Sequence, residues 1–145
     1  MASSLTSLPR DETIRDILQN VRTIALVGLS ANPARDSNGV FGFLLGQGYR
    51  AVGVNPGLVG QTIHGAPVYA RLADVPFAID MIDIFRNSEA TGGVADEALA
   101  LTPPPKVIWM QLGIINEAAA EKARARGVDV VMDRCPKIEI ARLGI

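Results

Sequence analysis

One short stretch of this chain joins a strand-like run of apolar residues, a glycine and a helix-like segment. Residues 24–27 are continuously apolar, as in a short strand of a parallel sheet that is buried on both faces. Gly28 follows at once and lets the backbone turn without the steric penalty of a Cβ atom. After a polar loop, residues 40–45 place apolar side chains at helical spacing. Free N–H groups and the dipole at the start of such a helix attract anions, so this stretch predicts a site for a phosphate group.

Strand-like and helix-like segments alternate along the chain. Five strands are expected, at residues 24–27, 50–54, 78–85, 106–110 and 128–132. One helix is expected to begin after Pro9, and a second, which includes residues 40–45, is expected to end near residue 47. Three more are expected: from an N-cap at Ser88 to about residue 101, from an N-cap at Asn116 to residue 126, and over residues 137–143. Residues 58–76 are expected to form an irregular connection, because glycines and prolines interrupt them. This alternation predicts an α/β fold: a Rossmann-like, doubly wound, mostly parallel five-stranded sheet with helices on both faces.

Length and composition indicate one domain. The 145 residues, of which 48% are hydrophobic, suffice for a single core, expected over residues 11–145 after a flexible N-terminus at residues 1–10. The 14 basic and 15 acidic residues nearly cancel, which argues against nucleic acid or a membrane surface as a partner. No apolar run is long enough for a membrane span and residues 1–20 do not resemble a signal peptide, so a cytoplasmic location is expected. One cysteine and one histidine exclude an internal disulfide and a metal site of several thiolates or imidazoles.

The carboxyl ends of the expected strands mark where a ligand should bind. In an open parallel sheet the ligand crevice lies beyond these ends, near the point where the strand order reverses. The residues selected by this rule are Gly28, Leu29, Ser30, Asn55, Pro56, Phe85, Arg86, Gln111, Leu112, Gly113, Asp133, Arg134 and Cys135. They supply amides, small polar groups, a phenyl ring and arginines, but no obvious acid–base pair. A dinucleotide site fits less well, because the motif G-x-G-x-x-G is absent and Asn55 stands where an acidic residue would bind the ribose.

At these residues the sequence resembles the small coenzyme A-binding proteins that consist of a single CoA-binding domain. The motifs that carry the resemblance are Val-Gly-Leu-Ser at 27–30, Val-Asn-Pro at 54–56, Asp-Ile-Phe-Arg at 83–86, Trp-Met-Gln-Leu-Gly at 109–113 and Val-Met-Asp-Arg-Cys at 131–135. The resemblance covers residues 23–143, and the fold it implies is similar to the nucleotide-binding domain of the succinyl-CoA synthetase α subunit. That enzyme's phosphohistidine lies in a further domain, and His64 falls in the irregular connection, so the ligase chemistry is not implied here.

The resemblance implies a site for coenzyme A without catalytic residues. Its residues are Gly28, Leu29, Ser30, Arg35, Ser37, Asn38, Asn55, Pro56, Phe85, Arg86, Gln111, Gly113 and Cys135. The glycine turn with Ser37 and Asn38 would hold the pyrophosphate, and Arg35 or Arg86 would add a bidentate contact to a phosphate oxygen. Phe85 would pack on the adenine or the pantetheine arm.

Each of these assignments has a structural alternative. Ser30 is also typical of a residue that satisfies turn amides, and Arg35 of a solvated loop charge. Arg86 is placed to pair with Glu89, and residues 55–56 alone would predict a turn.

Four other residues are expected to have structural roles. Trp109 is predicted to lie in the core, and His64 to be satisfied in a turn or on the surface. Asp80 and Asp83 are predicted to lie within the third strand and to accept hydrogen bonds from backbone amides.

Cys135 supports two interpretations. A free cysteine is commonly a buried, inert residue. This one follows the last expected strand on the ligand rim, beside Arg134, whose cation favours a thiolate. On the second interpretation Cys135 reaches the thiol of a bound coenzyme A and forms a mixed disulfide.

Taken together, the sequence favours a protein that binds coenzyme A or an acyl-CoA as a non-catalytic carrier, sensor or assembly component. One alternative is an enzyme, either an NAD(P)-dependent oxidoreductase or an acyl-CoA ligase-like subunit. Another is a protein-interaction module with a vestigial nucleotide pocket, in which side chains would fill the space at Gly28 and Ser30. A homodimer is compatible with so apolar a small chain, and the sequence does not identify its interface.

Overall fold

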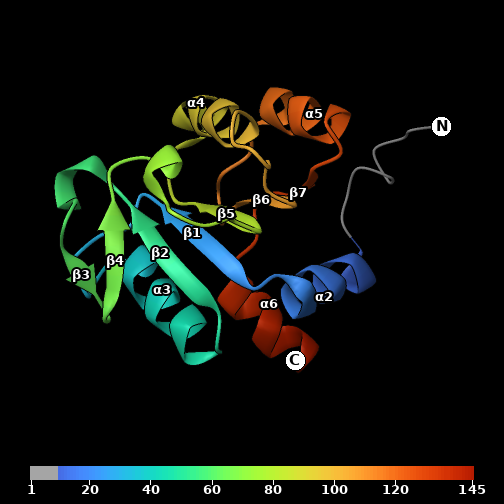
Figure 1. The fold of residues 1–145 in the computed structure, drawn as a ribbon. Coiled ribbons are helices and arrows are strands. Elements are labelled where there is room, and N and C mark those ends of the chain that lie inside the picture. The colour runs from blue at the N-terminus through green and yellow to red at the C-terminus, as the bar shows by residue number, and fades with distance from the viewer. Residues whose placement is uncertain (1–9) are drawn as a thin grey trace.

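The structure is a computed structural model and describes residues 10–145. Residues 1–9, most of the N-terminus expected to be flexible, lie outside the described residues. The described chain forms one sheet of seven strands in the order β3-β4-β2-β1-β5-β6-β7 (Figure 1). The strands are β1 Thr23–Val27, β2 Arg50–Val54, β3 Thr62–Ile63, β4 Ala66–Tyr69, β5 Met81–Ile84, β6 Val107–Met110 and β7 Asp129–Val131. All neighbouring strands run parallel except β3 and β4, which confirms the α/β, Rossmann-like class.

The prediction of five strands was wrong, because the segment expected to be irregular contributes two more. Strand β4 pairs in parallel with β2, and β3 pairs antiparallel with β4 at the edge of the sheet. Two 3-10 helices, η1 Pro56–Leu58 and η2 Leu72–Asp74, flank this pair. The strands are too short for an alternating pattern to stand out, and Pro67 lies within β4, a position that proline takes only near a sheet edge.

Several element boundaries also differ from the prediction. The third expected strand, residues 78–85, shortens to β5, so Asp80 precedes the strand. Helix α4 is capped by Asn87, whose side chain accepts a hydrogen bond from the amide of Ala90 (2.8 Å), and not by Ser88. The cap at Asn116 is confirmed, since its side chain accepts from the amide of Ala119 (2.9 Å).

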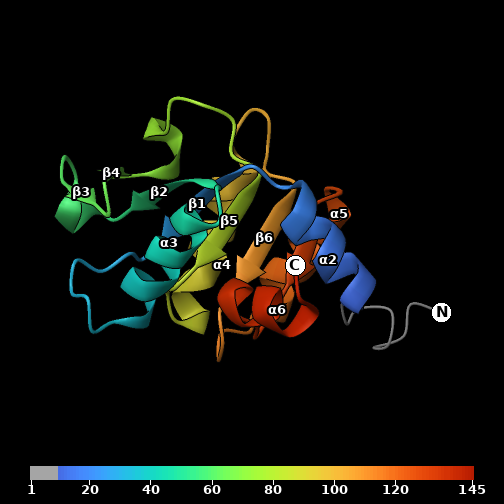
Figure 2. The ribbon, with the colours of Figure 1, turned by 90° about the horizontal axis from the view of Figure 1, so that it is seen from below.

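Helices cover both faces of the sheet, as predicted (Figures 1 and 2). One face is covered by α2 Asp11–Asn20, α3 Asp36–Gly46 and α6 Pro136–Leu143, and the other by α4 Ser88–Leu99 and α5 Glu117–Ala125. Each face has its own apolar core, because alternate residues of the central strands point to opposite sides. Trp109 is fully buried on the α3 and α6 side, which confirms it as a core residue, and its indole N–H donates to the carbonyl of Arg134 (2.8 Å).

The two aspartates expected to bind backbone amides behave differently. Asp80 accepts N–H hydrogen bonds from Arg22 (2.7 Å) and Thr23 (3.3 Å), as predicted. Burial raises the pKa of Asp80, but these amides and Lys106 more than offset it, so the pKa lies below its ordinary value. For Asp83 the prediction was wrong: the side chain is fully buried, and neither carboxyl oxygen has a hydrogen-bond partner within residues 10–145. Burial raises the pKa of Asp83 well above its ordinary value.

The strand order reverses between β1 and β5. From β1 the chain moves outward to β2 and β4, and it then crosses back to continue from β5 through β6 to β7 on the other side. The carboxyl ends of β1 and β5 therefore meet at the switch point, where an open α/β sheet leaves a crevice.

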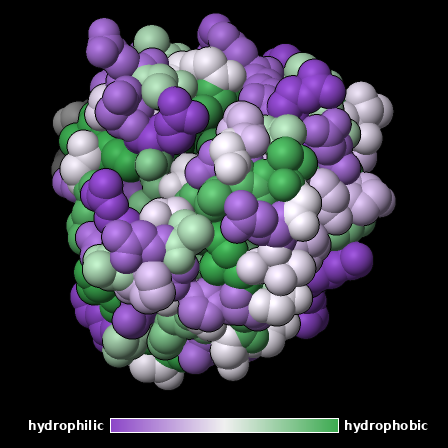
Figure 3. Space-filling view, turned by 90° about the vertical axis from the view of Figure 1, so that its left-hand side faces the viewer, coloured by the Kyte–Doolittle hydropathy of each residue, from purple (hydrophilic) through white to green (hydrophobic). Residues whose placement is uncertain are grey.

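The surface at the β3 edge mixes residue types. Hydrophilic and hydrophobic residues are interspersed over this face (Figure 3). This surface does not identify a dimer interface, and the homodimer remains a prediction. None of the described helices combines the length and the apolar character needed to cross a bilayer.

Candidate functional site

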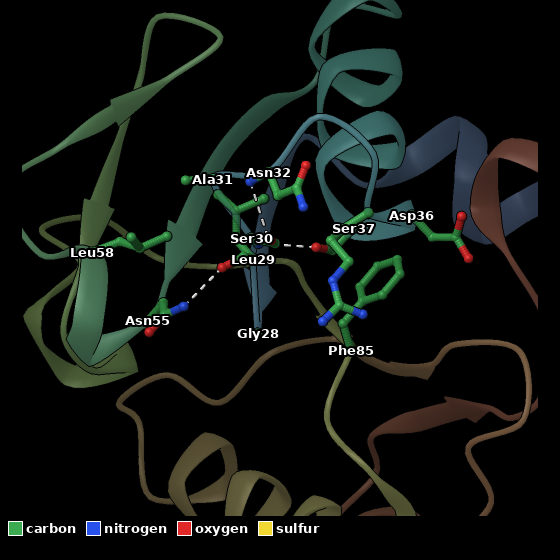
Figure 4. Close-up of a pocket in the computed structure, with 11 residues that line it drawn as sticks. Gly28, Leu29, Ser30, Ala31, Asn32, Asp36, Ser37, Asn55, Leu58 and Phe85 are labelled. Carbon is green, nitrogen blue, oxygen red and sulfur yellow. Dashed lines mark hydrogen bonds between the residues drawn. The ribbon is translucent and has the colours of Figure 1, made fainter.

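A cavity of about 720 Å³ opens at the switch point, beyond the carboxyl ends of β1, β2 and β5. We call it the loop cavity, because the segment between β1 and α3 forms much of its wall (Figure 4). It is lined by Gly28, Leu29, Ser30, Ala31, Asn32, Arg35, Asp36, Ser37, Asn55, Leu58 and Phe85. Gly28 and Ser30 both border this cavity, although a Cβ atom on Gly28 would lie 2.8 Å from the Phe85 carbonyl oxygen.

Backbone N–H groups are available in the loop cavity. Within residues 10–145, the amides of Ala31, Asp36 and Ser37 donate to no acceptor. Two of these amides belong to the first turn of α3, whose N-cap residue, Arg35, makes no capping hydrogen bond through its side chain. A cation at the positive end of a helix is unfavourable unless an anion lies between them. The arrangement is therefore suited to an anion held by the helix amides and the guanidinium.

Side-chain hydrogen bonds fix the loop around these amides. The Ser30 amide donates to Ser37 Oγ (2.9 Å), and Ser30 Oγ accepts from the amide of Asn32 (3.1 Å). Asn38 is buried, and its Nδ2 donates to the Ser30 carbonyl (2.9 Å). Because Nδ2 faces that carbonyl, Asn38 Oδ1 is an acceptor, so His64 Nε2 donates to it (2.8 Å). Asn38 and His64 thus help to fix the conformation of the loop, although neither lines the cavity.

Asn55 joins the end of β2 to the same loop. Its Nδ2 donates to the Leu29 carbonyl (2.8 Å) (Figure 4). Its Oδ1 accepts from the Gly57 amide (2.9 Å). The side chain therefore lines the cavity while both of its polar atoms are engaged within the protein.

A second cavity of about 480 Å³ continues from the first. It shares Arg35, Asp36 and Phe85 with the loop cavity, and we call it the apolar chamber because most of its lining is apolar. It is lined by Pro33, Ala34, Arg35, Asp36, Gly39, Val40, Phe85, Gln111, Leu112, Ile114, Cys135, Lys137 and Ile138. The two cavities adjoin at these shared residues, and we refer to them together as the cleft, which has a polar end rich in free amides and an apolar end.

Comparisons with known proteins identify the family of this chain. The pattern of the CoA-binding domain family covers residues 22–141. The chain belongs to the CoA-binding domain family. This family member is 36% identical to the uncharacterized protein YneT of Bacillus subtilis over 130 residues, which cover 90% of this chain and 93% of YneT.

Solved structures share the fold. A hypothetical protein from Pyrococcus horikoshii superposes on this CoA-binding domain with a TM-score of 0.88 at 34% identity, covering 96% of this chain and 95% of that one. A dinucleotide-forming acetyl-coenzyme A synthetase from Candidatus Korarchaeum cryptofilum, in complex with phosphate and ADP, matches with a TM-score of 0.66 at 25% identity. The match covers 79% of this chain but only 26% of the synthetase.

The cleft brings together most of the residues predicted to bind the ligand. Those that line it are Gly28, Leu29, Ser30, Arg35, Ser37, Asn55, Phe85, Gln111 and Cys135. Leu29 contributes only its backbone, because its side chain is fully buried and its Cδ2 lies 2.4 Å from where a Cβ on Gly53 would be. The missing side chain of Gly53 is what lets Leu29 enter the core.

Four predicted residues line neither cavity: Asn38, Pro56, Arg86 and Gly113. The Gly113 amide donates to Asp133 Oδ1 (2.6 Å), so this glycine joins two loops at the rim. Arg86 is exposed, with its Cδ packed against Gly28, and within residues 10–145 it has no ion pair, so the alternative of a pair with Glu89 is not found.

Sequence reasoning missed residues contributed by helices and by the 3-10 turn. Leu58 comes from η1, and Lys137 and Ile138 come from α6, which packs against α3 across the chamber. The strand-end rule does not select them because they follow no strand directly. For Lys137 and Ile138 the sequence predicted the closing helix itself, but the packing of that helix against α3 depends on the tertiary structure. Within the described residues, no three carboxylate, thiol or imidazole side chains gather as a metal site.

Proposed function

We propose that this protein binds coenzyme A or an acyl-CoA in the cleft and acts as a carrier, sensor or assembly component without chemistry of its own. The observation that carries the proposal is the uncapped start of α3, where free amides stand beside Arg35 at the strand-order switch point. Coenzyme A has a pyrophosphate for the amides and a long uncharged arm. Membership of the CoA-binding domain family supports the same ligand.

In this proposal the two ends of the cleft take the two ends of the ligand. The pyrophosphate lies at the amides of Ala31, Asp36 and Ser37, with Arg35 paired to a phosphate oxygen. The pantetheine arm passes Phe85, which lines both cavities, and enters the apolar chamber. The adenosine lies on the side of Asn55 and Leu58.

The non-catalytic part of the proposal is supported by the lining of the cleft. Among its described residues the only carboxylate is Asp36, and there is no histidine. His64 is held by Asn38 outside the cleft. A cavity of about 720 Å³ beside Gly28 and Ser30 favours a binding site over an interaction module whose pocket is filled by side chains.

Calorimetric titration tests the ligand class. Coenzyme A is expected to bind more tightly than NAD or ATP, and adenosine 3′,5′-bisphosphate, which lacks the arm, is expected to bind more weakly than coenzyme A. Equal affinity for NAD would instead favour the oxidoreductase alternative, and binding of none of these compounds would favour the interaction module.

The variant Arg35→Ala tests the anion site. Loss of a charge-assisted hydrogen bond worth about 1.5–3 kcal/mol is expected to weaken coenzyme A binding by about 10- to 100-fold. Arg71→Ala is the matched control, because Arg71 is exposed, pairs with Asp74 and lines neither cavity. If both variants weaken binding equally, the effect is one of net charge and the placement of the phosphate is wrong.

A further inference from the structure

One residue that lines the apolar chamber has a buried polar atom without a partner among residues 10–145. Gln111 is 5% exposed, and within the described residues its Oε1 has no hydrogen-bond donor. Its backbone is engaged, since its amide donates to the Ile84 carbonyl (3.2 Å). An unsatisfied buried carbonyl costs about 1–3 kcal/mol, so the side-chain amide would gain a partner by turning its oxygen toward an N–H of a ligand in the chamber.

The same chamber contains the chain's single thiol. Cys135 occupies the N-cap position of α6 and is 4% exposed, and it lines the chamber together with Gln111. Because the sequence has one cysteine, this thiol has no intramolecular partner, and a disulfide can form only with another molecule. Leu112 and Ile138 line the chamber and are about half exposed, so the chamber is open to solvent.

The two features suit the two functional groups of a pantetheine arm. The arm carries amide N–H groups along its length and a thiol at its end, and the chamber offers an orphan carbonyl oxygen and a thiol. The arm enters past Phe85, which lines both cavities, so its terminal thiol comes last into the chamber that contains Cys135.

We propose that Cys135 exchanges with a disulfide of coenzyme A and forms a mixed disulfide with the bound cofactor. This inference rests on the proposed function. The Cys135 thiol loses its proton to solvent, and the thiolate attacks one sulfur of coenzyme A disulfide. The sulfur–sulfur bond of that reagent breaks, and a new bond joins Cys135 Sγ to one coenzyme A. The second coenzyme A leaves as a thiolate and takes up a proton, so the reagent supplies the oxidising equivalents.

Intact-mass spectrometry after incubation with coenzyme A disulfide tests the exchange. The expected product is heavier than the protein by one coenzyme A less two hydrogens, is reversed by dithiothreitol, and is absent in Cys135→Ser. Glutathione disulfide is the control reagent, because it has the same reactive bond without the nucleotide. Binding in the cleft is expected to make coenzyme A disulfide react at least about tenfold faster, since it positions the reacting sulfurs. This selectivity should vanish in urea.

Two further variants separate recognition from reactivity. Arg35→Ala is expected to slow the reaction with coenzyme A disulfide more than the reaction with glutathione disulfide, because only the former has a pyrophosphate to bind. Gln111→Leu is expected to weaken coenzyme A binding without changing the affinity for adenosine 3′,5′-bisphosphate, because only the former carries the arm. Equal weakening for both ligands would contradict the placement of the arm.

The outcomes distinguish this inference from the proposed function. If reduced coenzyme A binds calorimetrically but its disulfide gives no adduct, or reacts no faster than glutathione disulfide, the exchange at Cys135 is wrong and the binding function stands. If coenzyme A neither binds nor reacts, both are wrong. A selective adduct on Cys135 supports both.

Discussion

Replacing Gly28 with alanine is expected to lower the free energy of unfolding by several kcal/mol, a large share of the total for a single domain. Gly28 has a φ of +92°, a backbone conformation that costs a residue with a Cβ atom about 1–2 kcal/mol. The new Cβ would also lie 2.8 Å from the Phe85 carbonyl oxygen, and such overpacking costs about 1–3 kcal/mol. The neighbour is backbone of the adjoining strand end, so it cannot move aside as a flexible side chain would.

Urea unfolding of Gly28→Ala measures this effect, with Gly93→Ala as the matched control. Gly93 is an exposed residue within α4, and a Cβ there meets no atom within 4 Å. The control is expected to be unchanged or more stable by up to about 1 kcal/mol, because alanine is the better helix former. Gly28→Ala as stable as the native chain would mean that β1 and β5 do not approach as closely as described.

The parallel arrangement of the strands explains why the sequence predicted much of the cleft. Ser30, Asn55, Phe85, Gln111 and Cys135 are far apart in the sequence, but each lies within four residues of the end of a strand. In a parallel sheet every strand ends at the same edge, so the rule that selects strand ends also gathers side chains in space. The glycine after the first strand then identifies which edge position admits a ligand.

What the sequence could not supply was the packing between elements. Leu29 was predicted as a contact to the ligand, but its side chain packs over Gly53 of β2 and enters the core, so that only its backbone faces the cavity. Asn38 was also predicted as a contact, but it is engaged by His64, a residue from the β3–β4 turn, which no local pattern connects to α3. In both cases the packing decides which atoms of the loop face the cleft, and the ligand contacts themselves remain predictions.

Asp83 was predicted to accept hydrogen bonds from backbone amides, but it lies in the core without a hydrogen-bond partner among the described residues. In register it lies beside Leu26 of β1 and Trp109 of β6, and all three belong to the face covered by α3 and α6. A carboxylate without a donor in such a place is unfavourable, so the group retains its proton, and its pKa is raised well above the ordinary value.

This burial makes stability depend on pH in a defined direction. Above pH about 4 the unfolded chain releases the Asp83 proton, but the folded chain keeps it. The folded state then binds more protons, so the free energy of unfolding falls as pH rises, by about 1.4 kcal/mol per pH unit, until the pH reaches the raised pKa. Below pH about 4 both states are protonated, and this contribution to stability is fully present.

Two variants of nearly the same shape isolate the effect. Asp83→Asn is uncharged at every pH and resembles the protonated carboxyl. Its stability is therefore expected to match that of the native chain near pH 4 and to exceed it increasingly at higher pH. Asp83→Leu removes the buried polar atoms as well, and it is expected to be more stable than Asp83→Asn by about 1–3 kcal/mol at all pH values. Urea unfolding from about pH 4 to 9 measures all three chains, and the difference between curves cancels the contribution of every other titrating group.

A difference between Asp83→Asn and the native chain that is constant with pH would show that Asp83 is ionised or partnered in the folded protein. Coenzyme A binding adds a second criterion, because Asp83 lines neither the loop cavity nor the apolar chamber. Unchanged affinity in Asp83→Leu would mean that the buried carboxyl acts on the fold alone. Lost affinity in a variant that folds more stably would mean that the carboxyl beneath the cleft acts on the position of Phe85 or Gln111. Asp83 would then influence ligand binding through the residues that line the cleft, although it contacts no ligand itself.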